Sequence, residues 1–397
     1  MGSLNAVRGK TLAIALPFPG LWDPGEAAGL LARFLRAADR SIRSDELFTF
    51  PWLDGGRGTI DLLVTQSLGS FLEVETTDAM GGEIIVPLGF AGEDGKLAVI
   101  EMSRVAHVAR SGEAGTTAGI GELIQDALDE GAFSILLCHE EPLACDAGLG
   151  AASALGVKFF DQHDKEIVFP SSEHSHQPLP VLSDIARVDV SSRSFTLLSS
   201  RVYIARWSSN DPNSTAHYSP TPELLSELQR LAEIIQRDTG IPPSIQDPSA
   251  SAIEFGLQAF LGAEVREGHA LVLEASGIEE AIGRGEFSSV IVLAPSISDI
   301  ETVPFKDFLD FLRTRIDRRA IIFSKDDQPS PNSNKHQEPH YSLADVTVFQ
   351  APIGPNANVE ELRRDFGIRL EKLLPTVLSA LKDQQPTKGK ATRVRNG

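Results

Sequence analysis

The chain of 397 residues contains few residues of several kinds, and each shortage excludes a class of protein. It has only two cysteines, Cys138 and Cys145, too few for a disulfide-stapled scaffold or a cysteine zinc site, and this number suits a reducing compartment. No apolar run is long enough to span a membrane, and the N-terminus has no signal-peptide pattern. We therefore expect a cytoplasmic protein.

Positive charge is also scarce. Lysine and arginine number 36 against 55 acidic residues, which gives a net charge of −19. A surface of this sign repels nucleic acids and anionic lipids, so neither a nucleic acid nor a membrane is an expected partner. A small-molecule ligand remains, and a nucleotide would need local cations or a cradle of backbone N–H groups. For the assembly we expect a monomer or a homodimer.

The pattern of apolar runs predicts an α/β protein. Runs that are apolar throughout are typical of parallel strands covered on both faces. Strands are predicted at 11–16, 47–50, 134–138, 157–160, 202–205, 290–294, 320–323 and 346–350, and helices at 27–38, 60–68, 120–130, 147–155, 221–237 and 359–382. Short alternating runs from 71 to 102 instead predict antiparallel strands, so a second domain of different character begins there.

Two helices carry clear start signals. Asp23 is a predicted N-cap, because Pro24 follows it and Glu26 lies three residues further on. Thr221 opens the long helix at 221–237 in the same way. These signals strengthen the predicted order of elements.

A glycine-rich stretch between the second strand and its helix is the first candidate site. Residues 51–59 read P-W-L-D-G-G-R-G-T. Three glycines close to a helix N-terminus leave backbone N–H groups uncovered by side chains, and such N–H groups bind anions in many proteins. The alternative is an ordinary strand-to-helix turn.

Four blocks of sequence, in the same order along the chain, resemble the type I glycerate kinases. They are D-G-G-R-G-T at 54–59, T-A-G-I-G-E-L-I-Q-D-A-L-D-E-G-A at 117–132, D-A-G-L-G-A-A-S-A-L-G-V-K-F-F-D at 146–161 and F-L-G-A-E-V-R-E-G-H-A-L-V-L-E at 260–274. The resemblance extends from about Thr11 to Lys382. It implies transfer of the γ-phosphoryl group of ATP to D-glycerate, with magnesium, giving 2-phosphoglycerate.

The resemblance also implies the domain organisation. We expect a flavodoxin-like parallel-sheet domain built from residues 1–66 and 285–383, and an inserted mixed α/β domain at 67–284, with a cleft between them. Residues 384–397 are basic and of low complexity, so a disordered tail is predicted.

The motifs that would carry phosphoryl transfer depart from the family pattern. This chemistry needs cations, N–H donors and carboxylates for the metal. In the family's first turn, D-S-F-K-G-S, the lysine is replaced here by Pro19 and the aspartate by Leu16. In the D-G-G-E-G-T motif, Arg57 replaces the glutamate. The residues retained in that motif are Asp54, Gly55, Gly56, Gly58 and Thr59.

The phosphate cradle of the family is changed as well. Glu140 and Glu141 stand in place of its two leading glycines, whereas Asp146, Gly148 and Gly150 are retained. Two carboxylates beside a triphosphate would repel it, by about 4 kcal/mol for each pair at ~4 Å and an effective dielectric constant of ~20.

The motif after the strand at 290–294 has also lost its functional groups. Its arginine and acidic positions fall on Ser296 and Ser298. Asp299 or Glu301 can take the acidic role only if the loop shifts.

These replacements favour a pseudoenzyme or a repurposed member of the family that binds a small ligand, with no cofactor and no metal site. The ligand-binding candidates are Gly55, Gly56, Arg57, Gly58, Thr59, Glu140, Glu141 and Gly148. Arg57 would pair either with a carboxylate ligand or with Glu140 or Glu141. His139 with this pair of glutamates matches no strong metal-ligand spacing.

The alternative is a divergent but active ATP-dependent glycerate 2-kinase. It would use Asp54, Asp146 and Asp299 as catalytic residues, with Arg57 in place of the lost lysine and with ATP and magnesium bound. A third hypothesis is a protein-interaction role carried by the surface.

Overall fold

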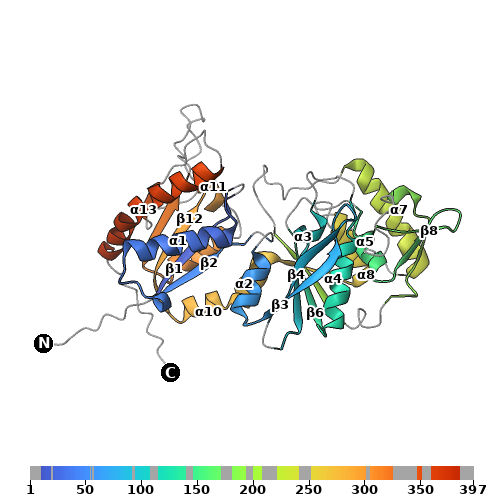
Figure 1. Cartoon of the computed structure of the whole chain (residues 1–397), viewed down its shortest axis with the longest axis horizontal. Helices are drawn as coiled ribbons and strands as arrows, with labels where there is room; N and C mark the ends of the chain where they lie inside the picture. Colours follow the sequence, from blue (N-terminus) through green and yellow to red (C-terminus); the bar gives the residue numbers. More distant parts are fainter. Residues whose placement is uncertain are drawn as a thin grey trace, which may run out of the picture. The chain divides into compact units, whose positions relative to one another are not determined.

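The computed structural model describes residues 10–18, 21–53, 55, 58–91, 94–107, 115–139, 146–170, 181–193, 200–207, 221–240, 252–300, 305–324, 347–350 and 359–384. The chain divides into two compact units, drawn in Figure 1. Unit 1 comprises Met1–Leu53 and Gly277–Gly397, and unit 2 comprises Asp54–Ser276. Each unit has a sheet of its own.

Unit 1 is built on a five-stranded parallel sheet, which confirms the predicted α/β class. Its strands are β1 (Lys10–Ala15), β2 (Leu47–Pro51), β12 (Phe287–Ala294), β13 (Arg318–Phe323) and β14 (Thr347–Gln350). Their order across the sheet is β14-β13-β12-β1-β2, which is the flavodoxin-like order. The order reverses between β1 and β12, and in such sheets ligands bind at the carboxyl ends of the strands at this point.

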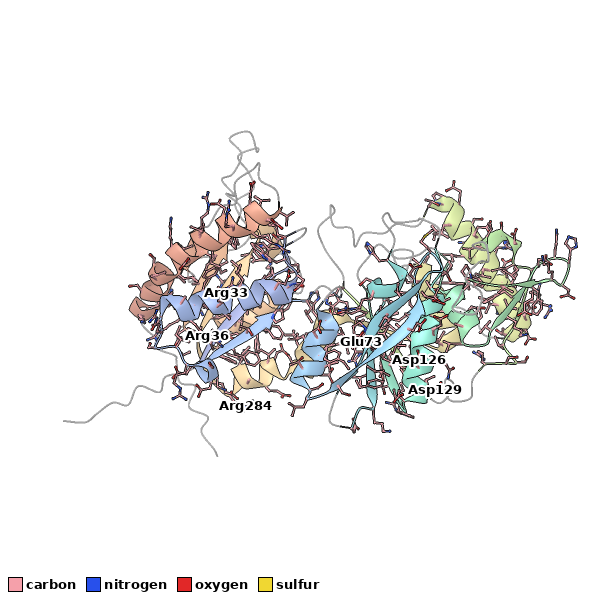
Figure 2. The ribbon with its side chains drawn as sticks, viewed as in Figure 1. Arg33, Arg36, Glu73, Asp126, Asp129 and Arg284 are labelled. Carbon is pink, nitrogen blue, oxygen red and sulfur yellow. The ribbon has the colours of Figure 1, made fainter. Side chains whose placement is uncertain are left out.

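Helices cover both faces of this sheet. The helices are α1 (Pro24–Ala38), α10 (Ile278–Gly283), α11 (Ile297–Ile300), α12 (Phe305–Arg313) and α13 (Val359–Asp383), with a 3-10 turn at Ser44–Glu46. The apolar faces of α1 and α13 share one core with alternate residues of β1, β12 and β13. On the other face, Phe308 of α12 stacks on Trp52 with ring centroids 5.2 Å apart. Arg33 and Arg36 of α1 are exposed (Figure 2).

The predicted start of α1 is confirmed in detail. The Asp23 carboxylate accepts from the Glu26 N–H at 2.7 Å, and the Glu26 carboxylate accepts from the Asp23 N–H at 3.3 Å. Pro24 occupies the first helical position. This reciprocal cap is the one the sequence spacing indicates.

Unit 2 contains a mixed six-stranded sheet. Its strands are β3 (Ser70–Thr77), β4 (Glu83–Ala91), β5 (Leu97–Glu101), β6 (Ser134–His139), β10 (Arg201–Arg206) and β11 (Glu264–Glu267), in the order β11-β10-β6-β5-β4-β3. β3, β4 and β5 are antiparallel neighbours, as the alternating runs predict. β5, β6, β10 and β11 are parallel, so their carboxyl ends meet at one edge.

Two groups of helices cover the two faces of this second sheet. α4 (Ala118–Asp129), α5 (Leu149–Ala154), α7 (Pro222–Thr239) and α8 (Ala252–Leu261) share a core with alternate residues of the strands, such as Ala98 and Ile100 of β5. On the other face, α2 (Thr59–Gln66) packs on β4, β5 and α9 (Gly268–Ser276). The backbone of α2 also donates a hydrogen bond to the Glu101 side chain. Because successive side chains of a strand alternate, Glu101 points to the opposite face of the sheet from Ile100. We call this second side of the sheet the α2–α9 face. A short helix, α3 (Ser103–Ala106), follows β5.

The contacts of α2 place it in unit 2. The boundary expected after residue 66 places it in the first domain instead. α2 packs closely on β4, since a Cβ atom at Gly89 would lie 2.6 Å from Val64 and 2.7 Å from Ile60.

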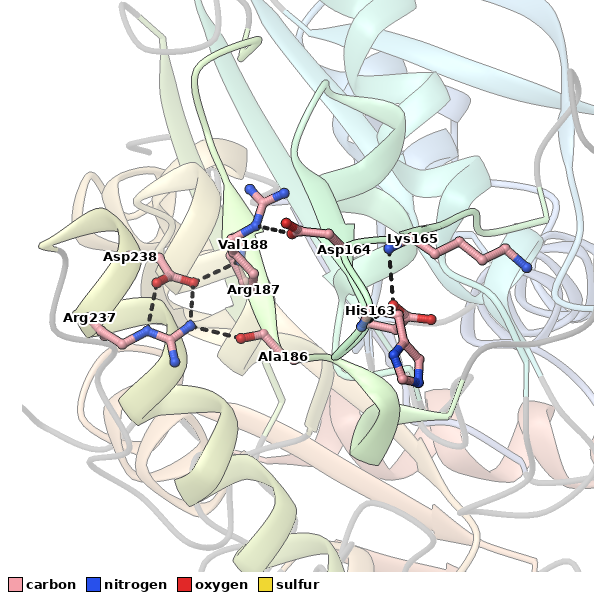
Figure 3. Close-up of polar contacts among 9 residues, drawn as sticks. His163, Asp164, Lys165, Ala186, Arg187, Val188, Arg237 and Asp238 are labelled. Atoms are coloured by element: carbon pink, nitrogen blue, oxygen red, sulfur yellow. Dashed lines mark hydrogen bonds and ion pairs between the residues drawn. The ribbon is translucent and has the colours of Figure 1, made fainter.

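A third, three-stranded sheet completes unit 2. It contains β7 (Lys158–Phe160), β8 (Glu166–Ile167) and β9 (Arg187–Asp189), in the order β8-β7-β9, with a 3-10 turn at Leu182–Asp184. α7 holds β9 by polar contacts (Figure 3): Asp238 accepts from the Val188 N–H at 2.8 Å, and Arg237 donates to the Ala186 carbonyl at 2.7 Å. β8 lies in a stretch expected to be a loop, because two residues give no alternating pattern. The predicted tail at 384–397, apart from Gln384, lies outside the described residues, as does the polar stretch 326–340. Gln384 is ordered by hydrogen bonds with the backbone of Arg319.

Candidate active site

In unit 1, the candidate residue Asp299 lies just beyond the carboxyl end of β12. It belongs to the short helix α11 and accepts a hydrogen bond from the hydroxyl of Ser296. This is the edge at which the strand order reverses, so the position suits a ligand site. Leu16, which stands where the family has aspartate, is buried and its N–H continues the sheet by donating to the Leu293 carbonyl at 2.9 Å. Pro19 lies outside the described residues.

In unit 2, the D-G-G-R-G-T stretch leads into the N-terminus of α2. Gly55 and Gly58 have φ values of 90° and 94°, a left-handed conformation that glycine adopts without strain. Gly58 is the N-cap of α2, and Thr59 is the first helical residue. Asp54, Gly56 and Arg57 lie outside the described residues, so their predicted roles stay predictions.

Glu101 anchors the first turn of α2. It is 1% exposed, at the carboxyl end of β5, and its carboxylate accepts from the Ile60 N–H at 2.8 Å and pairs with the Arg104 guanidinium. Burial raises the pKa of the Glu101 carboxyl, while the Ile60 N–H and Arg104 act in the opposite direction. Sequence reasoning missed this residue, although a glutamate directly after the apolar run 97–100 was a usable signal.

Asp146 links two of the recognisable sequence blocks. Its Oδ2 accepts from the Thr117 N–H at 2.7 Å and the Gly150 N–H at 3.1 Å, and its Oδ1 accepts from the Gly148 N–H at 3.0 Å. The Thr117 hydroxyl lies 2.9 and 3.0 Å from the two oxygens and itself accepts from the Ala151 N–H at 3.0 Å. Asp146 therefore holds the turn after β6 against the start of α4.

The surroundings of Asp146 affect both its charge and its role. Burial raises the pKa of Asp146 to about 6, and the bonds from Thr117, Gly148 and Gly150 oppose that rise. Because both oxygens already accept hydrogen bonds from buried groups, the arrangement suits a residue that positions the turn rather than one that binds a metal ion directly. Its assignment as a catalytic residue stays a prediction.

The turn after Asp146 is packed backbone to backbone against α8. Gly148, with φ of 75°, caps α5, and a Cβ atom there would lie 2.6 Å from the Ile253 carbonyl oxygen. Ala147 is left-handed as well, with φ of 56°. Gly148 is thus required by the packing, and its ligand-binding role stays a prediction. Glu140 and Glu141 lie outside the described residues.

A buried ion pair lies at the end of β10. Glu254 of α8 is fully buried, and Arg206 donates from Nε to Glu254 Oε1 at 3.0 Å and from Nη2 to the other oxygen. Sequence reasoning missed this pair too. Its signal was a glutamate within the apolar run A-I-E-F-G-L at 252–257.

Strand register brings these charged residues to one edge. Glu101 pairs with Cys138, His139 with Arg206, and Arg206 with Glu267, so they follow one another across the carboxyl ends of β5, β6, β10 and β11. In the described part of the chain, no three histidine, cysteine, aspartate or glutamate residues are grouped so that they could hold a metal ion. The charged residues that the register places at this edge could hold and orient a polar ligand through hydrogen bonds and ion pairs.

The model of the glycerate kinase family matches residues 18–206. The chain is 31% identical to a glycerate kinase of Haemophilus influenzae over 226 residues, and 28% identical to a glycerate 2-kinase of Escherichia coli over 287 residues. Both comparisons relate the chain to the glycerate kinases. The matched part covers 52% of this chain and 57% of the Haemophilus kinase, and 66% of this chain and 72% of the Escherichia kinase.

A solved structure shows the same fold as this chain. It comes from Salmonella typhimurium LT2 and is described as a candidate glycerate kinase 2. The TM-score is 0.69 at 22% identity, covering 94% of this chain and 98% of that one. The α/β fold is thus confirmed, and the matches support the resemblance to the glycerate kinases that the sequence blocks carry. Among the described helices, none is both long and apolar enough to cross a membrane.

Proposed function

We propose that this protein is an active ATP-dependent kinase of glycerate or a closely related hydroxy acid. Similarity to proteins named glycerate kinase carries the proposal. The network centred on Asp146 is compatible with it, because it holds Gly148, Gly150 and Thr117 in fixed positions within two of the resembling blocks. The similarity to proteins named glycerate kinase supports an active kinase more than the pseudoenzyme that the replaced motifs favour. A cytoplasmic location goes with this proposal.

In this proposal the protein acts mainly by positioning ATP and the acid that receives the phosphoryl group. Phosphoryl transfer depends on holding donor and acceptor in line and on stabilising charge on the phosphate oxygens. Left-handed glycines at 55 and 58 leave backbone next to the start of α2, where N–H groups can face an anion. At the start of α5 the N–H groups of Gly148 and Gly150 already donate to Asp146. Asp146 and Glu101 keep these two turns in place.

Magnesium would neutralise phosphate charge when bound, together with ATP. The described residues do not by themselves fit a magnesium site, because they include no group of three suitable ligands and Asp146 already accepts hydrogen bonds from buried groups. We therefore assign no step to the metal. Asp54 and Asp299 are the candidates that remain for contact with the substrate.

The second candidate function is binding of a small acid without catalysis. Leu16 favours it, since a buried leucine that continues the sheet stands where the family has an aspartate. The charge reversal at Arg57 and the glutamates at 140 and 141 point the same way.

A coupled assay for ADP separates the two candidates. With ATP, magnesium and D-glycerate, we expect ADP release that depends on glycerate. Asp54→Asn should lower kcat by at least ~100-fold, because it removes a carboxylate from the reacting groups. Asp45→Asn, an exposed change in unit 1, is the matched control and should leave kcat unchanged. ADP release that is the same with and without glycerate would contradict the proposal.

A further inference from the structure

Among the described residues of unit 2, two buried hydrogen-bond donors on the α2–α9 face have no partner. They are the hydroxyl of Thr59 and the indole N–H of Trp207. Thr59 is fully buried, and Trp207 is 8% exposed. A buried polar group without a partner destabilises the fold, so the pair calls for an explanation other than packing.

Trp207 lies where β10 and β11 end and α9 begins. Its ring covers Gly268, the first residue of α9, so closely that a Cβ atom there would lie 2.4 Å from the indole. The ring of His269 meets it edge-on, with centroids 6.2 Å apart. His269 is itself within 2.9 Å of the Glu267 carboxylate. The tryptophan is thus fixed at the carboxyl edge of the parallel strands.

Thr59 lies at the same edge, at the start of α2. The next residue, Ile60, donates its N–H to Glu101 at the end of β5. Only β6 separates β5 from β10, and Cys138 of β6 pairs with both Glu101 and Ala205. α2, which begins at Thr59, and α9, whose first residue is covered by Trp207, contact each other.

The chemistry around the two donors suits an anion. A hydroxyl and an indole N–H can both donate to an oxyanion, and Trp207 can only donate. α2 and α9 both begin at this edge, and the N-terminus of a helix carries partial positive charge. The Glu101 carboxylate does not cancel this attraction, because Arg104 is paired with it.

We propose that Thr59 and Trp207 together bind an oxyanion of the ligand, either the carboxylate of the acid or a phosphate oxygen. The identity of the ligand rests on the kinase function proposed above, whereas the site itself does not. Both atoms are covered in the ligand-free structure, so binding must be accompanied by a local movement of the residues around them. Such a movement changes the surroundings of the indole.

Fluorescence of Trp207 tests the site without turnover. The chain has three tryptophans, and Trp22→Phe with Trp52→Phe, both in unit 1, leaves Trp207 as the single emitter. We expect a saturable change in emission on titration with D-glycerate, with inorganic phosphate or with ATP. A response to glycerate identifies the carboxylate as the oxyanion, and a response to phosphate or ATP identifies the phosphate. No response to any of the three would overturn the proposal.

Substitutions that remove only the donors sharpen the test. Thr59→Val keeps the shape of the side chain and Trp207→Phe keeps an aromatic ring, and each should raise the Kd of the responding probe about tenfold to a hundredfold. Binding to the tryptophan-free variant is followed by the ligand-induced shift in Tm. Because each change removes an unpartnered buried donor, neither should lower the Tm of the ligand-free protein through a lost hydrogen bond. Thr59→Ser, which keeps the hydroxyl, is the matched control and should keep the Kd within about twofold.

The outcomes separate this site from the kinase function. If probe binding weakens in Thr59→Val and Trp207→Phe but the protein shows no glycerate-dependent ADP release, the binding site is supported and the kinase function is contradicted. If both variants release ADP with unchanged Kd and KM, the binding site is contradicted and the kinase function is supported.

Discussion

Asp146→Asn is expected to lower the free energy of unfolding of unit 2 by about 3 kcal/mol. The two oxygens of Asp146 accept from the N–H groups of Thr117, Gly148 and Gly150. An asparagine has one oxygen and one NH2 group, so at least one of these N–H groups would face another donor. Leaving a buried N–H group without an acceptor is among the larger effects of a single substitution. Urea denaturation at neutral pH measures the change.

The control for this variant is Asp161→Asn. Asp161 also accepts from backbone N–H groups, those of His163 and Lys165, but it does so in an exposed turn. Water can replace the lost acceptor there, so we expect a loss below about 1 kcal/mol. Equal losses in the two variants would show that burial of Asp146 does not contribute.

The titration of Asp146 gives a pH dependence with a definite sign. The pKa of Asp146 is raised from 3.8 to about 6 in the folded protein. A raised folded-state pKa means that the contribution to stability is fully present below pH 3.8 and is lost as the pH rises through about 6. Between about pH 5 and about pH 7.5 the wild type should lose roughly 1 kcal/mol relative to Asp146→Asn, which has no titrating group at this position. An opposite slope would show that the carboxylate is held in its charged form.

Gly119→Ala is expected to cost about 3 kcal/mol or more, or to prevent folding of unit 2. Gly119 lies in the first turn of α4, and a Cβ atom there would lie 2.0 Å from the carbonyl oxygen of Thr77. That oxygen belongs to the backbone of β3, so it cannot move aside as a flexible side chain would. Thermal and urea unfolding, or the yield of folded protein, measure the effect.

Gly29→Ala is the matched control, with an expected effect of the opposite sign. Gly29 lies within α1, and no atom is found within 4 Å of a Cβ atom built there. Alanine should therefore raise stability by roughly 0.5–1 kcal/mol, because it loses less conformational entropy than glycine in a helix. A similar loss in both variants would contradict the close contact of α4 with β3.

Local patterns in the sequence predicted most of the individual elements of the fold. The apolar runs at 11–16 and 290–294 correspond to β1 and β12, and the Asp23 capping box is present as expected. These signals are local, since each depends on residues a few positions apart. The two-residue strand β8 was missed because it is too short to carry a pattern.

The candidate site was harder to predict, because it depends on contacts between distant residues. Glu101 and Ile60 are 41 positions apart, and Arg206 and Glu254 are 48 apart. A single sequence does not show that β5, β6 and β10 are neighbours, so it gives no reason to group residues at their ends. Comparison with the family pattern drew attention to retained and replaced motif residues, and these two contacts lie outside the retained motifs.

The hydrogen bonds of Asp146 bear on what sequence similarity can detect in this family. Thr117 and Asp146 are 29 positions apart, and each belongs to a recognisable block. Any descendant that keeps this packing needs the aspartate, the threonine and the glycines of the turn, whether or not it turns over a substrate. Natural selection for a folded chain alone would preserve both blocks. A search based on these two blocks would therefore find proteins that share this packing, and it would not by itself separate active kinases from inactive ones.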